Sequence, residues 1–138
     1  MVMTTGTPPG EDRGARLLSD CAHEIRSTVD LPIQAQCEPP KDNHWHFRMK
    51  EAGIDSLGMH IEVVNPDLRK KIMPGKSQVP LEKYFESFNT AVEVFGWGQV
   101  STYILAGLGD TAEEIIEVCK KLTSIGVYPF VVPFVPVT

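Results

Sequence analysis

The chain has 138 residues, of which 42% are hydrophobic and 22% are charged. These values are ordinary for one globular domain with an apolar core, and they exclude a disordered chain. Thirteen basic and eighteen acidic side chains give a net charge of −5, which argues against binding to nucleic acid or to an anionic membrane. The longest apolar run, residues 127–137, is too short for a membrane-spanning helix. The first residues do not resemble a signal peptide, so we expect a cytoplasmic protein.

The three cysteines are far apart in the sequence. Their spacing argues against a disulfide framework, and no pair has the spacing of a zinc or redox motif. Cys21 and Cys119 lie on apolar faces of predicted helices, so we expect both to be buried as small hydrophobic residues.

Short β-branched runs alternate with longer segments of helical periodicity. This alternation is typical of βαβ units that build a parallel sheet. The predicted strands are residues 2–7, 31–37, 56–64, 99–106 and 127–135.

The predicted helices carry apolar residues at spacings of three and four, which gives each of them one buried face. Thr111 and Glu114 predict a capping box at the start of the last helix. His44 and His46 flank Trp45 in a short helix, where two residues two apart point in different directions, so a solvated surface is favoured over a metal site. The predicted helices are residues 11–29, 43–52, 80–95 and 111–126, with a brief helical turn at 69–72.

Consecutive parallel strands joined by right-handed crossovers lie side by side. We therefore predict an α/β fold: a partial (β/α) barrel of the TIM type, with about five parallel strands in a single domain over residues 1–138. Five strands cannot close an eight-stranded barrel, and we expect the domain to be truncated at both ends with open strand edges.

Ligands of parallel sheets lie at the carboxyl ends of the strands. Gly107 and Gly109 precede a capped helix there, which fits either an anion site or an ordinary turn. Glu62 emerges at the same rim, with His60 on the same strand face. A carboxylate in that position either binds ribose hydroxyls or pairs with Arg69 or Lys71.

Three runs in order resemble radical S-adenosylmethionine (SAM) enzymes, above all the biotin synthase and lipoyl synthase branch. They are Gly58-Met59-His60-Ile61-Glu62-Val63, Met73-Pro74-Gly75-Lys76 and Ser101-Thr102-Tyr103-Ile104-Leu105-Ala106-Gly107-Leu108-Gly109-Asp110. The resemblance covers nearly the whole chain, from the second to about the sixth strand of that family's partial barrel. It implies SAM and a [4Fe–4S] cluster as cofactors.

By position, the resemblance implies that Thr5-Gly6-Thr7 meet the methionine amino group. Glu62 would hold the ribose or the amino acid part, and Lys76 or Arg69 the methionine carboxylate. Ile104 and the turn that ends at Asp110 would lie along the adenine, with Asp110 in place of the usual glutamate, and the fifth predicted strand would supply an apolar wall. The candidate cofactor-binding residues are Thr5, Gly6, Thr7, Glu38, His60, Glu62, Arg69, Lys76, Ile104, Gly107, Gly109, Asp110, Val132 and Pro133.

The chain departs from the family in one respect. The family binds its cluster through three cysteines spaced C-x3-C-x2-C, and this triplet is absent, with Cys37 alone at the expected rim. We therefore expect this chain alone to be inactive, as part of an enzyme whose cluster ligands lie outside it and whose substrate is an unidentified small molecule. No metal ligand and no catalytic residue is assigned.

Two other functions remain open. One is a non-catalytic half-barrel that binds or assembles by pairing its open strand edges with itself or with the rest of a barrel. The other is a barrel enzyme of another kind that binds phosphate at the turn from Gly107 to Thr111.

Overall fold

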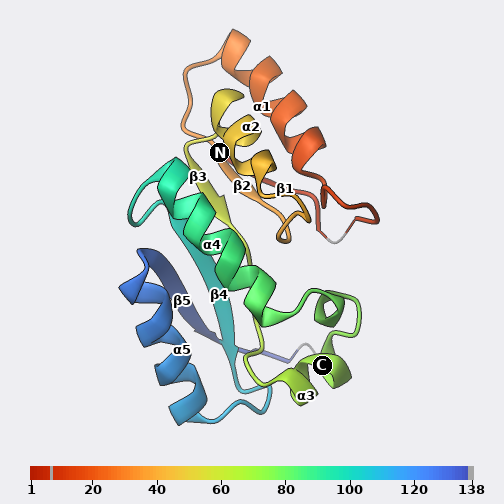
Figure 1. Ribbon diagram of the computed structural model, residues 1–138, viewed down its shortest axis with the longest axis vertical. Coiled ribbons are helices and arrows are strands. Elements are labelled where there is room, and N and C mark those ends of the chain that lie inside the picture. The colour runs from red at the N-terminus through yellow and green to blue at the C-terminus, as the bar shows by residue number, and fades with distance from the viewer. Residues whose placement is uncertain (7, 137–138) are drawn as a thin grey trace.

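The computed structural model describes residues 1–6 and 8–136. Five strands form one sheet in the order of the sequence, and every neighbouring pair is parallel (Figure 1). The predicted α/β fold with five parallel strands alternating with helices is confirmed, and it is consistent with a partial β/α barrel. The strands are β1 (Val2–Thr4), β2 (Gln34–Gln36), β3 (Ser56–Gly58), β4 (Val100–Ala106) and β5 (Val127–Pro133).

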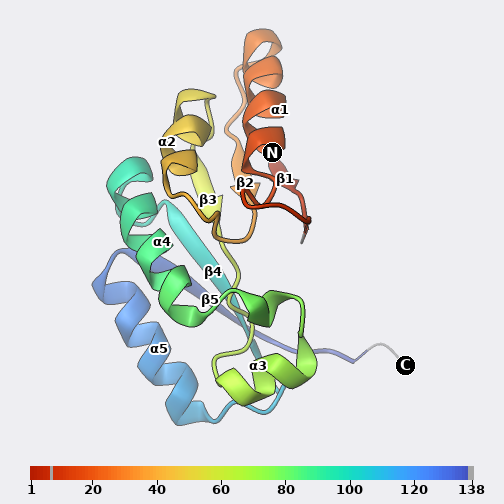
Figure 2. The same cartoon turned by 45° about the vertical axis from the view of Figure 1, so that its right-hand side comes forward.

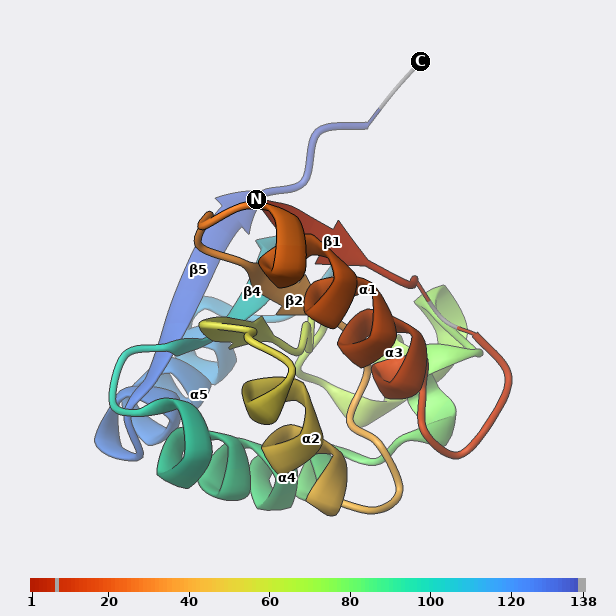
Figure 3. The same cartoon turned by 90° about the horizontal axis from the view of Figure 1, so that it is seen from above.

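The helices gather on one face of this sheet, and the opposite face carries no helix (Figures 1 and 3). Figure 2 shows the chain leaving β5 and running away from the helices towards the C-terminus. The helices are α1 (Ala15–Thr28), α2 (His44–Glu51), α3 (Pro66–Ile72), α4 (Leu81–Phe95) and α5 (Ala112–Ser124), with a short 3₁₀ helix η1 (Lys76–Gln78) between α3 and α4.

Side chains in register across the strands explain the two faces. Ala35, Leu57, Val100 and Val127 are paired in one row and are all buried in the core. Because successive residues of a strand point to opposite faces, the next row faces away from the helices. That row contains Gln36, Gly58, Ser101 and Tyr128 and is largely polar.

The ends of the helices follow local backbone chemistry. The Thr111 hydroxyl accepts from the Glu114 amide at 3.2 Å and the Glu114 carboxylate accepts from the Thr111 amide at 2.8 Å, so the predicted capping box is confirmed. The helix α1 begins at Ala15, four residues after the predicted start, because Arg13 and Gly14 have φ of 50° and 81°. A β-carbon at Gly14 would lie 2.7 Å from the Thr5 side chain, so only glycine allows this turn to pack closely against the end of β1.

Two sequence predictions about buried groups are wrong. His46 was expected on a solvated surface, but it is fully buried, and its Nε2 lies 2.7 Å from the Ser87 hydroxyl in the packing between α2 and α4. Cys21 was expected in the core and is exposed, whereas Cys119 is partly buried. Within the described residues, no helix is long and apolar enough to span a membrane.

The third strand departs most from its predicted range. It was expected over residues 56–64 but ends at Gly58, after which Glu62 alone bridges to β4. Gly58 pairs with Ser101 and Glu62 with Ile104, so four steps on this strand match three on β4. One extra residue makes this segment a β-bulge, and bulges re-aim side chains next to functional sites.

Candidate functional site

A pocket of about 230 Å³ opens at the carboxyl ends of β1, β2 and β3. Five of the predicted cofactor-binding residues line it. Three larger hollows have volumes of about 570, 500 and 360 Å³. The first lies at the loops before α1 and α4, the second between α4 and α5, and the third beside the start of β5. No predicted site residue lines any of them. The small pocket is lined by Thr4, Gly6, Gln36, Cys37, Glu38, His60, Glu62 and Lys76.

The bulge after β3 supplies two of these side chains. Glu62 has φ of 63°, which is rare for a residue other than glycine. Its amide donates to the Tyr103 carbonyl at 2.8 Å, and its own carbonyl accepts from the Leu105 amide at 2.8 Å. Backbone bonds on both sides therefore hold Glu62 in this conformation, which directs its carboxylate to the pocket.

Glu62 and Lys76 form an ion pair within the pocket, with 2.7 Å between Nζ and Oε1. Each side chain is roughly a quarter exposed, at 24% and 22%. Of the two alternatives left open for Glu62, pairing with Arg69 or Lys71 is not observed, because its partner is Lys76. An opposite pair of accessible charges suits a zwitterion, because an amino acid has an ammonium for the carboxylate and a carboxylate for the ammonium.

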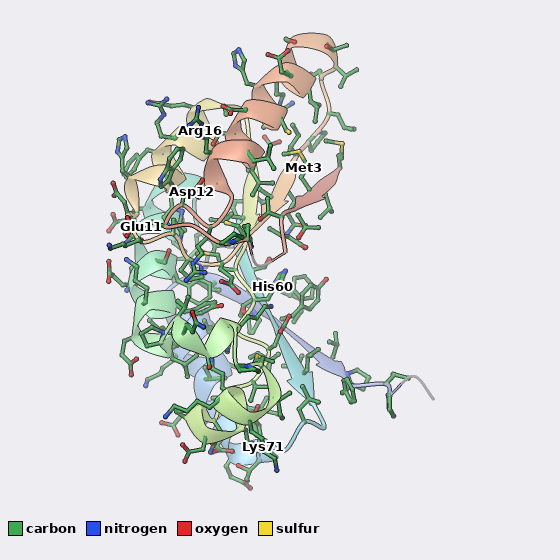
Figure 4. All side chains as sticks on the ribbon, turned by 90° about the vertical axis from the view of Figure 1, so that its right-hand side faces the viewer. Met3, Glu11, Asp12, Arg16, His60 and Lys71 are labelled. Atoms are coloured by element: carbon green, nitrogen blue, oxygen red, sulfur yellow. The ribbon has the colours of Figure 1, made fainter. Side chains whose placement is uncertain are left out.

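His60 lies beside β4 at the middle of the molecule (Figure 4). Its Nδ1 accepts from the Tyr103 amide at 3.2 Å, which places the proton of the neutral ring on Nε2. The Nε2 atom is buried and has no hydrogen-bond partner among the described residues. Burial, followed by the nearby Lys76, lowers the pKa of His60 to about 4, so the imidazole is neutral at pH 7.

Glycine at position 58 makes room for this ring. A β-carbon there would lie 2.9 Å from His60 Cε1 and 3.2 Å from Gln36 Cγ. The end of β3 therefore accommodates His60 only because Gly58 has no side chain.

Acidic and thiol groups line the β2 side of the pocket. Glu38 is almost completely buried, with Arg13 3.6 Å from its Oε2. Burial, followed by Glu38 and Asp12, raises the pKa of the Cys37 thiol to about 12, so this cysteine is not a reactive thiolate at pH 7.

Arg69, the alternative to Lys76 for the methionine carboxylate, does not line the pocket. Only 2% of it is exposed, and its guanidinium donates to the carbonyls of Ile61, Val63 and Lys76, the last two at 3.3 Å. It also lies over the Tyr84 ring, 4.9 Å from the centroid. Arg69 therefore holds the backbone that presents Glu62 and Lys76.

Asp110 likewise binds backbone groups. Its two carboxylate oxygens accept from the amides of Val64 and Asn65 at 2.9 and 2.7 Å. This carboxylate ties the turn after β4 to the segment after β3. The Thr111 amide is already bonded to Glu114, so an acidic turn with a satisfied helix start argues against the phosphate site left open above.

The remaining predicted residues that the structure describes do not line the pocket. Gly107 and Gly109 adopt φ of 109° and 119°, and a side chain at Gly109 would lie 3.0 Å from Leu68. Ile104 is buried in the core. Thr5 donates to the Arg13 carbonyl at 3.4 Å, and Thr7 lies outside the described residues. The last two, Val132 and Pro133, are at the end of β5.

Sequence reasoning missed Thr4 and Gln36 as pocket residues. The alternation of side chains along a strand could have indicated them. Thr4 and Gln36 are the last residues of β1 and β2, and both lie on the face without helices.

The described residues do not fit the cluster implied by the resemblance. No group of three His, Cys, Asp or Glu side chains among them is arranged to hold a metal ion. The described cysteines belong to separate elements, and Cys37 is the one at the rim. The pocket itself is below the range of about 300–1,000 Å³ typical of ligand sites, so it fits a part of SAM rather than the whole molecule.

The chain is thus an α/β protein with a pocket at the carboxyl ends of its parallel strands, the position in which β/α barrels carry their sites. No protein-family model matches the chain. It is 36% identical over 110 residues to bacteriochlorophyllide c C-7(1)-hydroxylase of Chlorobaculum limnaeum. The matched region covers 78% of this chain and 27% of the hydroxylase. It is 31% identical over 122 residues to lipoyl synthase of Aliivibrio fischeri, which covers 84% of this chain and 36% of the synthase.

Both relatives are radical SAM enzymes, so a partial relationship to that superfamily is supported. The chain spans about a third of the length of these curated relatives.

Proposed function

We propose that this chain is part of the core of a radical SAM enzyme and binds SAM at the carboxyl ends of its strands. In the complete enzyme, cysteines outside this chain would hold a [4Fe–4S] cluster. SAM and that cluster would supply a 5′-deoxyadenosyl radical for hydrogen abstraction from a small substrate. The observation that carries the proposal is the convergence of Gly6, Glu38, His60, Glu62 and Lys76 on one pocket, in a chain related to two such enzymes.

The charges of the pocket support binding of the methionine end of SAM. In this proposal the Lys76 ammonium binds the carboxylate, and Glu62 binds the ammonium or the ribose. The neutral His60 supplies an Nε2 donor next to them. Arg69 and Asp110 then act as positioning residues, since the groups they bind belong to the backbone around the pocket.

Calorimetric titration with S-adenosylhomocysteine tests the proposal on this chain. This analogue has the same amino acid and ribose groups as SAM and is stable. We expect Glu62→Gln and Lys76→Met each to weaken binding about tenfold, the equivalent of about 1.4 kcal/mol. Lys71→Met, at an exposed lysine of α3, is the matched control and should bind like the wild type. A wild-type chain that binds no analogue, or three variants of equal affinity, would contradict the proposal.

The cluster belongs to a separate test. A longer protein that carries the three-cysteine segment should turn brown on anaerobic loading with iron and sulfide. A protein that stays colourless would count against a radical SAM enzyme.

A further inference from the structure

The bulge after β3 displaces one backbone amide from its regular acceptor on β4. The Met59 amide donates to the Ser101 carbonyl at 3.0 Å. A parallel ladder advances by two residues, so the next bond of a regular strand would join the Ile61 amide to the Tyr103 carbonyl. The Glu62 amide takes that carbonyl instead, at 2.8 Å. Because a buried amide needs a partner, Ile61 requires another acceptor.

The Thr102 side chain supplies this acceptor. The Ile61 amide donates to the Thr102 hydroxyl oxygen at 2.9 Å, and the hydroxyl donates to the Tyr103 carbonyl at 3.4 Å. That carbonyl is the one that accepts from the Glu62 amide. One hydroxyl therefore bonds both to the amide before Glu62 and to the carbonyl that holds Glu62 itself.

Thr102 lies on the core side of the sheet and does not line the pocket. It is fully buried, and it alternates along β4 with Val100 and Ile104, which are buried apolar residues of the same strand face. A hydroxyl in such surroundings costs free energy unless it is hydrogen-bonded. Its two bonds to the bulge account for a polar residue in this apolar row.

We propose that Thr102 is a positioning residue for the pocket, whose hydroxyl holds the bulge and thereby directs the Glu62 carboxylate towards Lys76. The φ of 63° at Glu62 persists only if its surroundings hold it. Valine has the shape of threonine without the hydroxyl, so it would leave the Ile61 amide buried and without an acceptor. The consequence for a ligand rests on the proposed function, whereas the consequence for Glu62 does not.

Calorimetric titration with S-adenosylhomocysteine tests the consequence for a ligand. We expect Thr102→Val to weaken binding about tenfold, as Glu62→Gln does. Thr102→Ser keeps the hydroxyl and is the matched control, which should bind within about twofold of the wild type. In a chain that already carries Glu62→Gln, adding Thr102→Val should weaken binding no further, because Thr102 acts through Glu62.

Three results of this titration would overturn the inference. They are a folded Thr102→Val chain that binds like the wild type, a serine variant as weak as the valine variant, and losses that add in the double variant.

Nuclear magnetic resonance of the ligand-free chain tests the consequence for Glu62 directly. In the wild type and in Thr102→Ser we expect a nuclear Overhauser contact between the side chains of Glu62 and Lys76, which pair at 2.7 Å. Thr102→Val should lose this contact, and a folded valine variant that retains it rules out the positioning role. If the wild type binds no analogue, the proposed function fails, and this contact still decides the role of Thr102.

Amide hydrogen exchange of the wild type covers a valine variant that does not fold. The Ile61 amide should be protected, since the Thr102 hydroxyl is its acceptor. Exchange of this amide at the rate of an unstructured peptide would contradict the inference.

Discussion

At the residue scale, the absence of a side chain at Gly58 decides where His60 lies. The ring takes the space that a β-carbon would fill, and its Nδ1 replaces the carbonyl that a regular strand would offer to the Tyr103 amide. A small residue in β3 thus determines both a hydrogen bond to β4 and the protonated nitrogen of the ring.

We expect Gly58→Ala to lower the free energy of unfolding by about 1–3 kcal/mol, because the added methyl group is forced against His60 and Gln36. Urea denaturation measures the change. Gly75→Ala is the control, since its β-carbon would have no neighbour within 4 Å and the backbone there is helical. Equal stability of the two variants would show that the ring moves aside at no cost.

At the scale of elements, the turn after β4 and the segment after β3 are joined by one carboxylate. Asp110 accepts from two backbone amides, those of Val64 and Asn65, just before α3. These bonds give Asp110 a structural role whether or not adenine lies nearby.

We expect Asp110→Asn to destabilise the protein by about 1.5–3 kcal/mol, since an amide replaces a charged acceptor of two bonds. Asp67→Asn, at an exposed position in the first turn of α3, should cost less than about 1 kcal/mol. Thermal unfolding in the absence of ligand distinguishes the two. If Asp110→Asn unfolds at the wild-type temperature, Asp110 does not hold these segments together.

The order and type of the elements could be predicted from the sequence because apolar periodicity determines them. The Thr111 cap and the five strands follow from local residues alone. The bulge at Glu62 could not be predicted, since its extra residue exists only relative to β4. The burial of Arg69 was missed for a related reason: its carbonyl partners belong to that irregular segment.

At the scale of the whole molecule, buried neutral imidazoles make folding depend on pH. His46 is completely enclosed between helices, and burial, followed by Lys83, lowers its pKa to about 4. The unfolded chain binds this proton near pH 6.5. The stabilisation is therefore fully present above about pH 6.5 and is lost as the pH falls towards 4.

We expect the free energy of unfolding to fall between pH 7 and pH 4.5, with His46 contributing as much as about 3 kcal/mol. His46→Gln should flatten this dependence, and His44→Gln, on the exposed side of the same helix, should not. Urea denaturation at the two pH values provides the comparison. If both variants lose the same free energy of unfolding between pH 7 and pH 4.5, His46 does not cause the loss.

The buried guanidinium of Arg69 affects how the pocket responds to amino-acid substitutions in evolution. Its guanidinium donates to the carbonyls on either side of Glu62 and to the carbonyl of Lys76. One side chain therefore holds the backbone from which both charged side chains of the pocket extend. Because Arg69 is buried and does not line the pocket, substitutions there would shift Glu62 and Lys76 together. Under the proposed function, ligand specificity could therefore change through a substitution on α3, with every residue in the pocket left unchanged.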